Sequence, residues 1–196
     1  MRFALLVANE NFEAPGTEQN QEEDEDEEGQ LPLLSTDKSG RADDISSQLY
    51  RPNVHSFSPA VGSGSGTEFN LQGNDIITAV RCWEQYSSYI SGFQLRFGYI
   101  WTPIVGYAYG SSHEIELFDG ENIIQISGTH AHYIQSLIFV TSKHRLLIVG
   151  RSAGHSFNIY PKYMDSYLVF LSGRVHGALT GLMAHWGTFS PNSTDA

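Results

Sequence analysis

The sequence contains very little cysteine. Cys82 is the only one among 196 residues, so a disulfide within the chain is impossible and the disulfide framework of small secreted domains is excluded. The fold must therefore be held together by burial of apolar side chains. Cys82 lies in the apolar-rich segment 77–83, where a small buried side chain is commoner than a reactive thiol. We therefore predict that Cys82 is buried and has no catalytic role.

Long apolar runs and clusters of basic side chains are also missing. No segment approaches the roughly 18 consecutive apolar residues that a transmembrane helix requires, so the sequence predicts no membrane span. The seven Lys and Arg residues that follow position 61 form no stripe. Because neutralising the phosphates of a duplex requires such a stripe, we expect no nucleic-acid partner.

The negative charge is concentrated at the beginning of the chain. Residues 1–61 hold 13 acidic and 4 basic side chains, whereas the remainder holds 9 and 7. Residues 22–28 are seven consecutive acidic side chains, a composition that cannot bury enough apolar surface to offset the chain entropy. The sequence therefore predicts a disordered acidic segment over residues 1–53. A solvated tail is the favoured interpretation, with calcium buffering or docking to a basic partner as alternatives.

Two short features concern localisation. Residues 1–8 carry one arginine and an apolar run of six residues, shorter than the roughly 7–15 of a secretory signal, so they resemble a weak or truncated signal. Asn192, Ser193 and Thr194 fit the N-glycosylation pattern within a polar tail over residues 190–196. Together they favour a secreted, extracellular protein.

From residue 54 onward the pattern is that of an all-β domain, with frequent glycines and short apolar segments between turn residues. The stretch 129–149 lacks Gly and Pro, but its β-branched and aromatic residues favour a hairpin that turns at 142–144 over a helix. About ten strands without an amphipathic helix predict a closed barrel, sandwich or prism. The strands are expected at residues 76–83, 93–97, 114–117, 124–127, 133–141, 145–149, 157–160, 167–171 and 179–186.

One segment matches a catalytic pattern. Residues 150–154 fit the G-x-S-x-G motif around Ser152, and Asp165 and His176 follow in the order of a hydrolase triad. That motif requires a helix directly behind the serine, whereas residues 155–161 have the pattern of a strand that ends at proline. We therefore favour a turn between two strands and predict no enzyme activity.

Two further segments have the composition of ligand sites. His130 and His132 are two residues apart, so in a strand they share a face and could begin a zinc site, although two ligands are too few and incidental exposed histidines are favoured. The glycine-rich residues 62–66 do not fit a nucleotide-binding loop. Their glycines would instead let backbone N–H groups approach a ligand closely. No metal or other cofactor is predicted.

Eight short motifs follow one another between residues 54 and 189, and they are residues 62–69, 77–81, 92–98, 124–128, 137–141, 156–158, 171–174 and 185–186. In their order and spacing they resemble the jacalin-related lectins, especially the zymogen-granule lectins of animals. The resemblance implies a β-prism of three Greek-key four-stranded sheets that binds carbohydrate, and it implies no enzyme activity.

The resemblance also implies a sugar site, often for mannose, where three loops meet at one end of the prism. These loops map to residues 62–66, 129–132 and 176–180. The family's third loop has the pattern Gly-x-x-x-Asp, and here His176 and Thr180 stand in place of the Gly and Asp. A hydroxyl replaces a carboxylate acceptor only in part, which puts mannose recognition in question. The expected site residues are Gly64, Ser65, Gly66, Thr129, His130, His132, His176, Gly177, Ala178 and Thr180.

Three hypotheses for the function follow. The first is a secreted lectin whose partners are glycans or glycoproteins and which acts at mucus, secretory granules or microbial surfaces, as the resemblance implies. The second is a jacalin-like module for protein interaction whose sugar site was lost through the changes at His176 and Thr180. The third, far behind, is a serine hydrolase at Ser152. Assembly into a homo-oligomer stays open in each case.

Overall fold

The structure is a computed structural model that describes residues 51–86 and 88–190. The acidic run 22–28, the apolar run near Met1 and the glycosylation triplet at Asn192 lie outside the described residues. What the sequence predicts for them stays a prediction.

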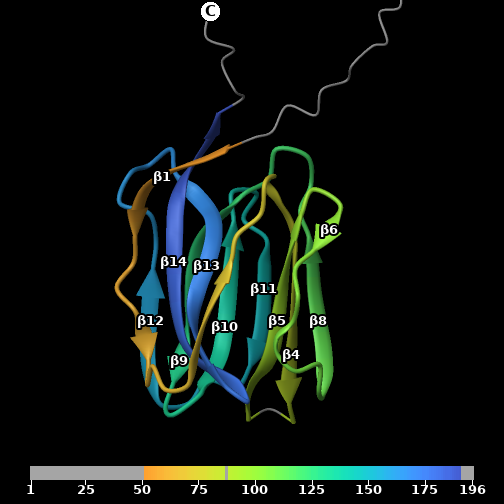
Figure 1. Cartoon of the computed structure of the whole chain (residues 1–196), viewed down its shortest axis with the longest axis vertical. Coiled ribbons are helices and arrows are strands. Elements are labelled where there is room, and N and C mark those ends of the chain that lie inside the picture. The colour runs from red at the N-terminus through yellow and green to blue at the C-terminus, as the bar shows by residue number, and fades with distance from the viewer. Residues whose placement is uncertain (1–50, 87, 191–196) are drawn as a thin grey trace, which may run out of the picture. The chain divides into compact units, whose positions relative to one another are not determined.

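The described residues form strands and connecting loops, with no helix among them (Figure 1). Accordingly, this part of the chain offers no helix of the length and apolarity that a membrane span needs. The strands are β1 (Arg51–Phe57), β2 (Val61–Gly62), β3 (Thr67–Leu71), β4 (Ile77–Gln85), β5 (Tyr89–Phe97), β6 (Ile100–Trp101), β7 (Val105–Gly106), β8 (Ser111–Glu116), β9 (Ile123–His130), β10 (Ile134–Thr141), β11 (Leu146–Gly150), β12 (His155–Ile159), β13 (Tyr167–His176) and β14 (Ala178–Ser190).

Three antiparallel sheets surround one core, which confirms the predicted prism. Their strand orders are β1-β14-β13-β3, β11-β10-β9-β12 and β6-β5-β4-β8. The short strands β2 and β7 add a fifth strand to the first and third sheets. In the second and third sheets the last strand of four returns beside the first, which is the Greek-key order. Each sheet contributes a large side chain to the shared core. These side chains are at most 1% exposed to solvent, and they are Trp186, Phe139 and Phe93.

The predicted alternation appears as alternating burial along the strands. In β5, Phe93 and Leu95 are fully buried, whereas Gln94 between them is only half-buried. The hairpin predicted within residues 129–149 is present as β10 and β11, and His144 adopts a left-handed φ of 60° in its turn. Cys82 is buried as predicted, and this burial raises the pKa of its thiol.

The domain is slightly longer at both ends than the sequence pattern indicates. β1 begins at Arg51, which pairs with Ser190 at the end of β14. Residues 51–53 therefore lie in the folded domain and not in the acidic segment to which their composition assigned them. Pro52 argued against a strand at this position, because proline cannot donate a hydrogen bond to a β-ladder. Proline is tolerated here because β1 is an edge strand of its sheet.

Candidate functional site

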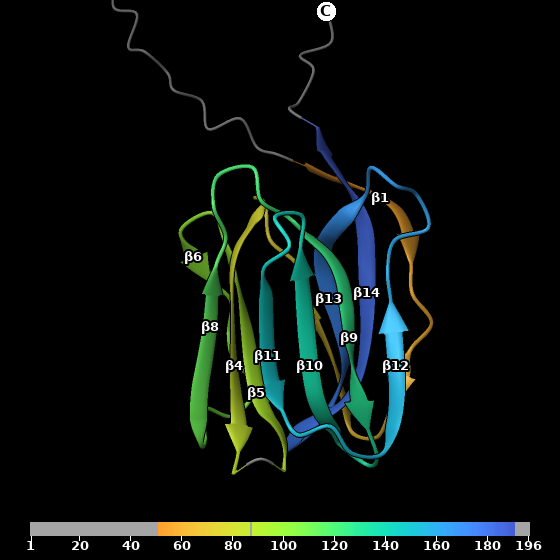
Figure 2. The ribbon, with the colours of Figure 1, turned by 180° about the vertical axis from the view of Figure 1, so that it is seen from behind.

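Three loops that are far apart in the sequence meet at one end of the prism. They are the connection from β2 to β3, the connection from β9 to β10, and the β13–β14 turn, which lie at the lower end in Figures 1 and 2. The Ser63 hydroxyl donates a 2.7 Å hydrogen bond to the carbonyl of His132. The Thr180 hydroxyl donates one of 2.6 Å to the carbonyl of Ser65. The glycine-rich loop is thus fastened to both of the other loops.

The glycine-rich loop depends on backbone conformations that favour glycine. Gly62, Gly64 and Gly66 have φ values of 99°, 68° and 90°. A Cβ atom at Gly66 would lie only 2.1 Å from the carbonyl oxygen of Val175, whereas one at Gly64 would meet nothing within 4 Å. The loop is therefore packed tightly against β13 at Gly66 and open to solvent at Gly64.

Thr180 holds this loop from beneath. Its side chain is fully buried, and its hydroxyl lies 2.6 Å from the carbonyl oxygen of Ser65 and 3.0 Å from that of Arg174. The Gly64 N–H donates in turn to the Thr180 carbonyl at 3.3 Å. Thr180 therefore stabilises the glycine-rich loop from within and contributes nothing to the exposed surface of the loop end.

The ten residues predicted for the site differ in their exposure to solvent. His132, His176 and Gly177 are exposed on neighbouring loops, with 6.4 Å between the two imidazole centroids. Thr129 and Ala178 are buried together with Thr180. The exposed group also contains Gly64 and Gly66, while Ser65 and His130 are half-buried.

The two histidines of the zinc hypothesis have different neighbours. β9 ends at His130, whose ring lies 5.8 Å from that of His155 on the adjacent strand. His132 lies in the following loop, where its ring contacts Tyr133 at 4.6 Å. Within residues 51–86 and 88–190, no group of three or more His, Cys, Asp or Glu side chains is placed to hold a metal ion.

The segment that matches the hydrolase motif is a connection between two strands, as predicted. β11 ends at Gly150 and β12 begins at His155, so a strand follows Ser152 where the catalytic motif requires a helix. The N–H of Ala153 donates to the Thr129 hydroxyl at 3.2 Å. The β11–β12 connection is therefore hydrogen-bonded to the end of β9 through Thr129.

Aromatic side chains that no sequence pattern indicates surround the loop end. Five tyrosines, which we call the tyrosine row, lie beside the three loops and come from the tip of the β4–β5 hairpin, from the segment after β7 and from the β9–β10 connection. Their scattered sequence positions gave no periodic signal, because the turns between strands bring them together. The row consists of Tyr86, Tyr89, Tyr107, Tyr109 and Tyr133.

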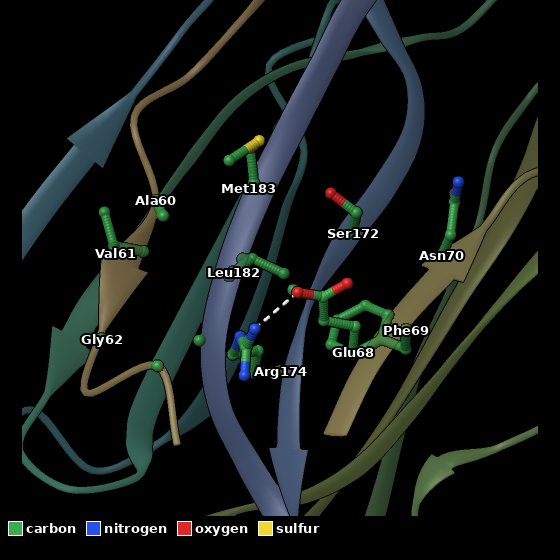
Figure 3. Close-up of a pocket in the computed structure, with 13 residues that line it drawn as sticks. Ala60, Val61, Gly62, Glu68, Phe69, Asn70, Ser172, Arg174, Leu182 and Met183 are labelled. Atoms are coloured by element: carbon green, nitrogen blue, oxygen red, sulfur yellow. Dashed lines mark hydrogen bonds and ion pairs between the residues drawn. The ribbon is translucent and has the colours of Figure 1, made fainter. Parts of the chain in front are cut away.

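A groove of about 480 Å³ lies on the outer face of the first sheet, beside the glycine-rich loop. Arg174 and Glu68 form an ion pair across adjacent strands in it, and Ser172 and Met183 lie further along the groove (Figure 3). Arg174 also donates to the Gly66 carbonyl at 3.0 Å. The ion pair therefore helps to fix the start of β3 and the end of the glycine-rich loop.

A three-sheet prism with three hydrogen-bonded loops at one end is the architecture of a lectin of the β-prism class. The sequence model described as the Jacalin-like lectin domain matches residues 41–185. This chain belongs to that family.

The relatives and solved structures agree with this assignment. Zymogen granule membrane protein 16 of Homo sapiens is 36% identical over 162 residues, which cover 81% of this chain and 92% of that protein. The prostatic spermine-binding protein of Mus musculus is 30% identical over 140 residues, 69% of either chain. A crystal structure of a prostate-specific WGA16 glycoprotein lectin superimposes with a TM-score of 0.60 at 27% identity, over 67% of this chain and 98% of that one.

Proposed function

We propose that this chain is a non-enzymatic, carbohydrate-binding lectin that binds glycans where its three loops meet. The observation that carries the proposal is the direct fastening of the glycine-rich loop to both other loops, through Ser63 to His132 and through Thr180 to Ser65. This arrangement presents an exposed surface that is fixed before any ligand arrives, and such preorganisation reduces the entropic cost of binding. Membership in the Jacalin-like lectin domain family supports the same function.

The chemistry of this surface favours neutral hydrogen bonding to sugar hydroxyls. The three loops, residues 62–66, 129–132 and 176–180, contain no Asp or Glu. His132 and His176 instead provide ring nitrogens that can donate or accept, and the open backbone at Gly64 and Gly177 allows close approach. Neutral hydrogen bonds are weaker than bonds to a carboxylate, so we expect weak binding of a single sugar.

The alternative is a prism that binds proteins and has lost its sugar site. Burial of Thr180 favours this alternative, because the residue at the position of the family's Asp presents no surface to a ligand. A glycan array probed with the intact chain separates the two hypotheses. Selective binding to one class of glycan supports the lectin, and a uniformly negative array at high protein concentration supports the protein-interaction module.

The double variant His176→Gly, Thr180→Asp is expected to bind mannose about fivefold more tightly than the unmodified chain, because a carboxylate acceptor adds about 1 kcal/mol after desolvation. A carboxylate cannot donate to the carbonyls of Ser65 and Arg174 as the Thr180 hydroxyl does. It is therefore expected to turn away from them, toward the loop end. Calorimetry or NMR titration with mannose measures the change.

Thr180→Val is the matched control, since it removes the hydroxyl without adding an acceptor. It should destabilise the domain by about 1 kcal/mol and should not increase mannose binding. If the folded double variant bound mannose no better than Thr180→Val, the mapping of the third loop onto residues 176–180 would be wrong.

We further propose that the protein is secreted or stored in secretory granules. The names of the relatives called zymogen granule membrane protein 16 support this location, as does the apolar run that follows Arg2. Expression in secretory cells, followed by mass spectrometry of the amino terminus of the released protein, tests it. Retention of the whole chain in the cytosol would contradict the proposal.

A further inference from the structure

The tyrosine row starts within the proposed site and continues onto a second sheet. Tyr133 lies in the β9–β10 loop directly after His132, and its ring lies 4.8 Å from that of Tyr89 on β5. The hydroxyls of Tyr89 and Tyr107 are 3.2 Å apart. A Cβ atom at Gly177 would lie 3.9 Å from the ring of Tyr107, so the row also touches the β13–β14 turn.

From Tyr107 the row leads away from the three loops. The rings of Tyr107 and Tyr109 are 6.2 Å apart, and that of Tyr109 is 5.9 Å from Tyr86 in an edge-to-face arrangement. Tyr86 stands in the β4–β5 turn with a left-handed φ of 43°. The side chains of these three residues are 39%, 45% and 77% exposed, in the order Tyr107, Tyr109, Tyr86. Exposure therefore increases with distance from the loops.

The row is held in place by hydrogen bonds. The side-chain oxygen of Gln85 accepts from the hydroxyls of both Tyr89 and Tyr107. The Ser91 hydroxyl donates to the carbonyl of Tyr109 at 2.6 Å, and the Tyr107 N–H donates to the Ser91 carbonyl at 3.0 Å. These bonds fasten the segment after β7 to β5. The rings are therefore arranged before a ligand binds, which lowers the ordering cost.

The exposed rings and hydroxyls suit a chain of pyranose units. Each pyranose has an apolar face of C–H groups and a polar edge of hydroxyls, and tyrosine offers a matching apolar ring with a hydroxyl at its edge. Hydrogen bonding to Tyr107 raises the pKa of Tyr89, and interaction with Tyr86 raises that of Tyr109. Both phenols are therefore neutral at physiological pH.

We infer that the tyrosine row binds the further sugar units of an oligosaccharide whose terminal unit occupies the three loops. This inference rests on the proposed function and specifies its substrate class as oligosaccharide chains. Two observations favour a glycan over a protein on this surface. The row is continuous with the loop end through Tyr133 and Gly177, and its exposed rings with hydroxyls at their edges match the apolar faces and polar edges of a sugar chain.

Titration with sugars of increasing length tests the inference. The probes are mannose, mannobiose, mannotriose and mannopentaose, with galactose and N-acetylglucosamine series in parallel. Affinity is expected to increase about fivefold or more from the monosaccharide to the longer chain of the series that binds.

In Tyr109→Ala this gain should disappear, while monosaccharide affinity and thermal unfolding stay unchanged because Tyr109 lies outside the three loops and is half-exposed. Tyr99→Ala is the matched control, since Tyr99 is 99% exposed in the β5–β6 turn and lies outside the row.

Each other outcome has a distinct meaning. Monosaccharide binding without a gain with chain length overturns the inference and leaves the proposed function intact. A gain that persists in Tyr109→Ala also overturns the inference. Failure of every sugar, together with a negative array, overturns both. If Tyr109→Ala changes the sedimentation coefficient of the free chain and not its sugar affinity, the row is a protein interface.

Discussion

Gly66→Ala is expected to destabilise the domain by about 2–5 kcal/mol. This is the sum of the conformational cost of alanine in a left-handed backbone conformation and the cost of the steric clash of its Cβ. Its added Cβ would lie 2.1 Å from the Val175 carbonyl oxygen and 2.8 Å from the Cβ of His176. Neither atom can move alone, because both belong to the end of β13. The glycine-rich loop and the β13–β14 turn must then separate, and we expect glycan binding to be lost with them.

Gly64→Ala separates this clash from the backbone strain. Gly64 has a similar left-handed φ of 68°, but an added Cβ meets nothing within 4 Å. Its stability loss should therefore be only the conformational cost, about 1–2 kcal/mol. Urea unfolding of both variants measures the difference. Equal losses would mean that Gly66 is needed only for its φ and that the loop is not tightly packed against β13.

Glu121→Gln is expected to lower the free energy of unfolding by about 3 kcal/mol. This value is at the lower end of the range for breaking a buried ion pair, because the Arg145 side chain is one-third exposed. The Glu121 carboxylate is buried and accepts hydrogen bonds from Arg145, from the Thr141 hydroxyl and from the Phe118 N–H. It thereby joins the β8–β9 connection to the β10–β11 hairpin. Glutamine keeps the shape but cannot replace both acceptors.

The same group predicts a pH dependence. The Arg145 guanidinium, followed by the other donors, lowers the pKa of Glu121 from 4.5 to about 2. A depressed folded-state pKa stabilises the protein above the unfolded value, so this contribution is full above pH 4.5 and is lost as the pH falls toward about 2. Chemical unfolding between these pH values should show a shallower decline for Glu121→Gln than for the unmodified chain.

Glu68→Gln is the matched control, because Glu68 also pairs with an arginine but its side chain is 76% exposed. Its loss should stay below about 1 kcal/mol, as for other surface ion pairs. If the two variants lost the same stability, or had the same pH profile, the Glu121 network would contribute no more than a surface pair.

The sequence by itself determined the class of the fold and the identity of most strands. Alternation of apolar and polar residues is a local property with a period of two. Segments such as 93–97 therefore indicate which face of the strand is buried, whatever strand pairs with them. The left-handed glycines and the turn at 142–144 are likewise local. The three loops of the site were predicted through the family resemblance, and the structure brings them together.

The tertiary structure alone decided how each candidate site residue is placed. Thr180 appeared as a weakened sugar ligand in the sequence, but its hydroxyl is buried against the carbonyls of Ser65 and Arg174. β1 formed despite Pro52 because β14 supplies its pairing, and the tyrosine row formed because Tyr89 and Tyr133 meet from different sheets. Burial, pairing and ring contact all depend on the partner that folding brings from a distant part of the chain, and no local pattern encodes that partner.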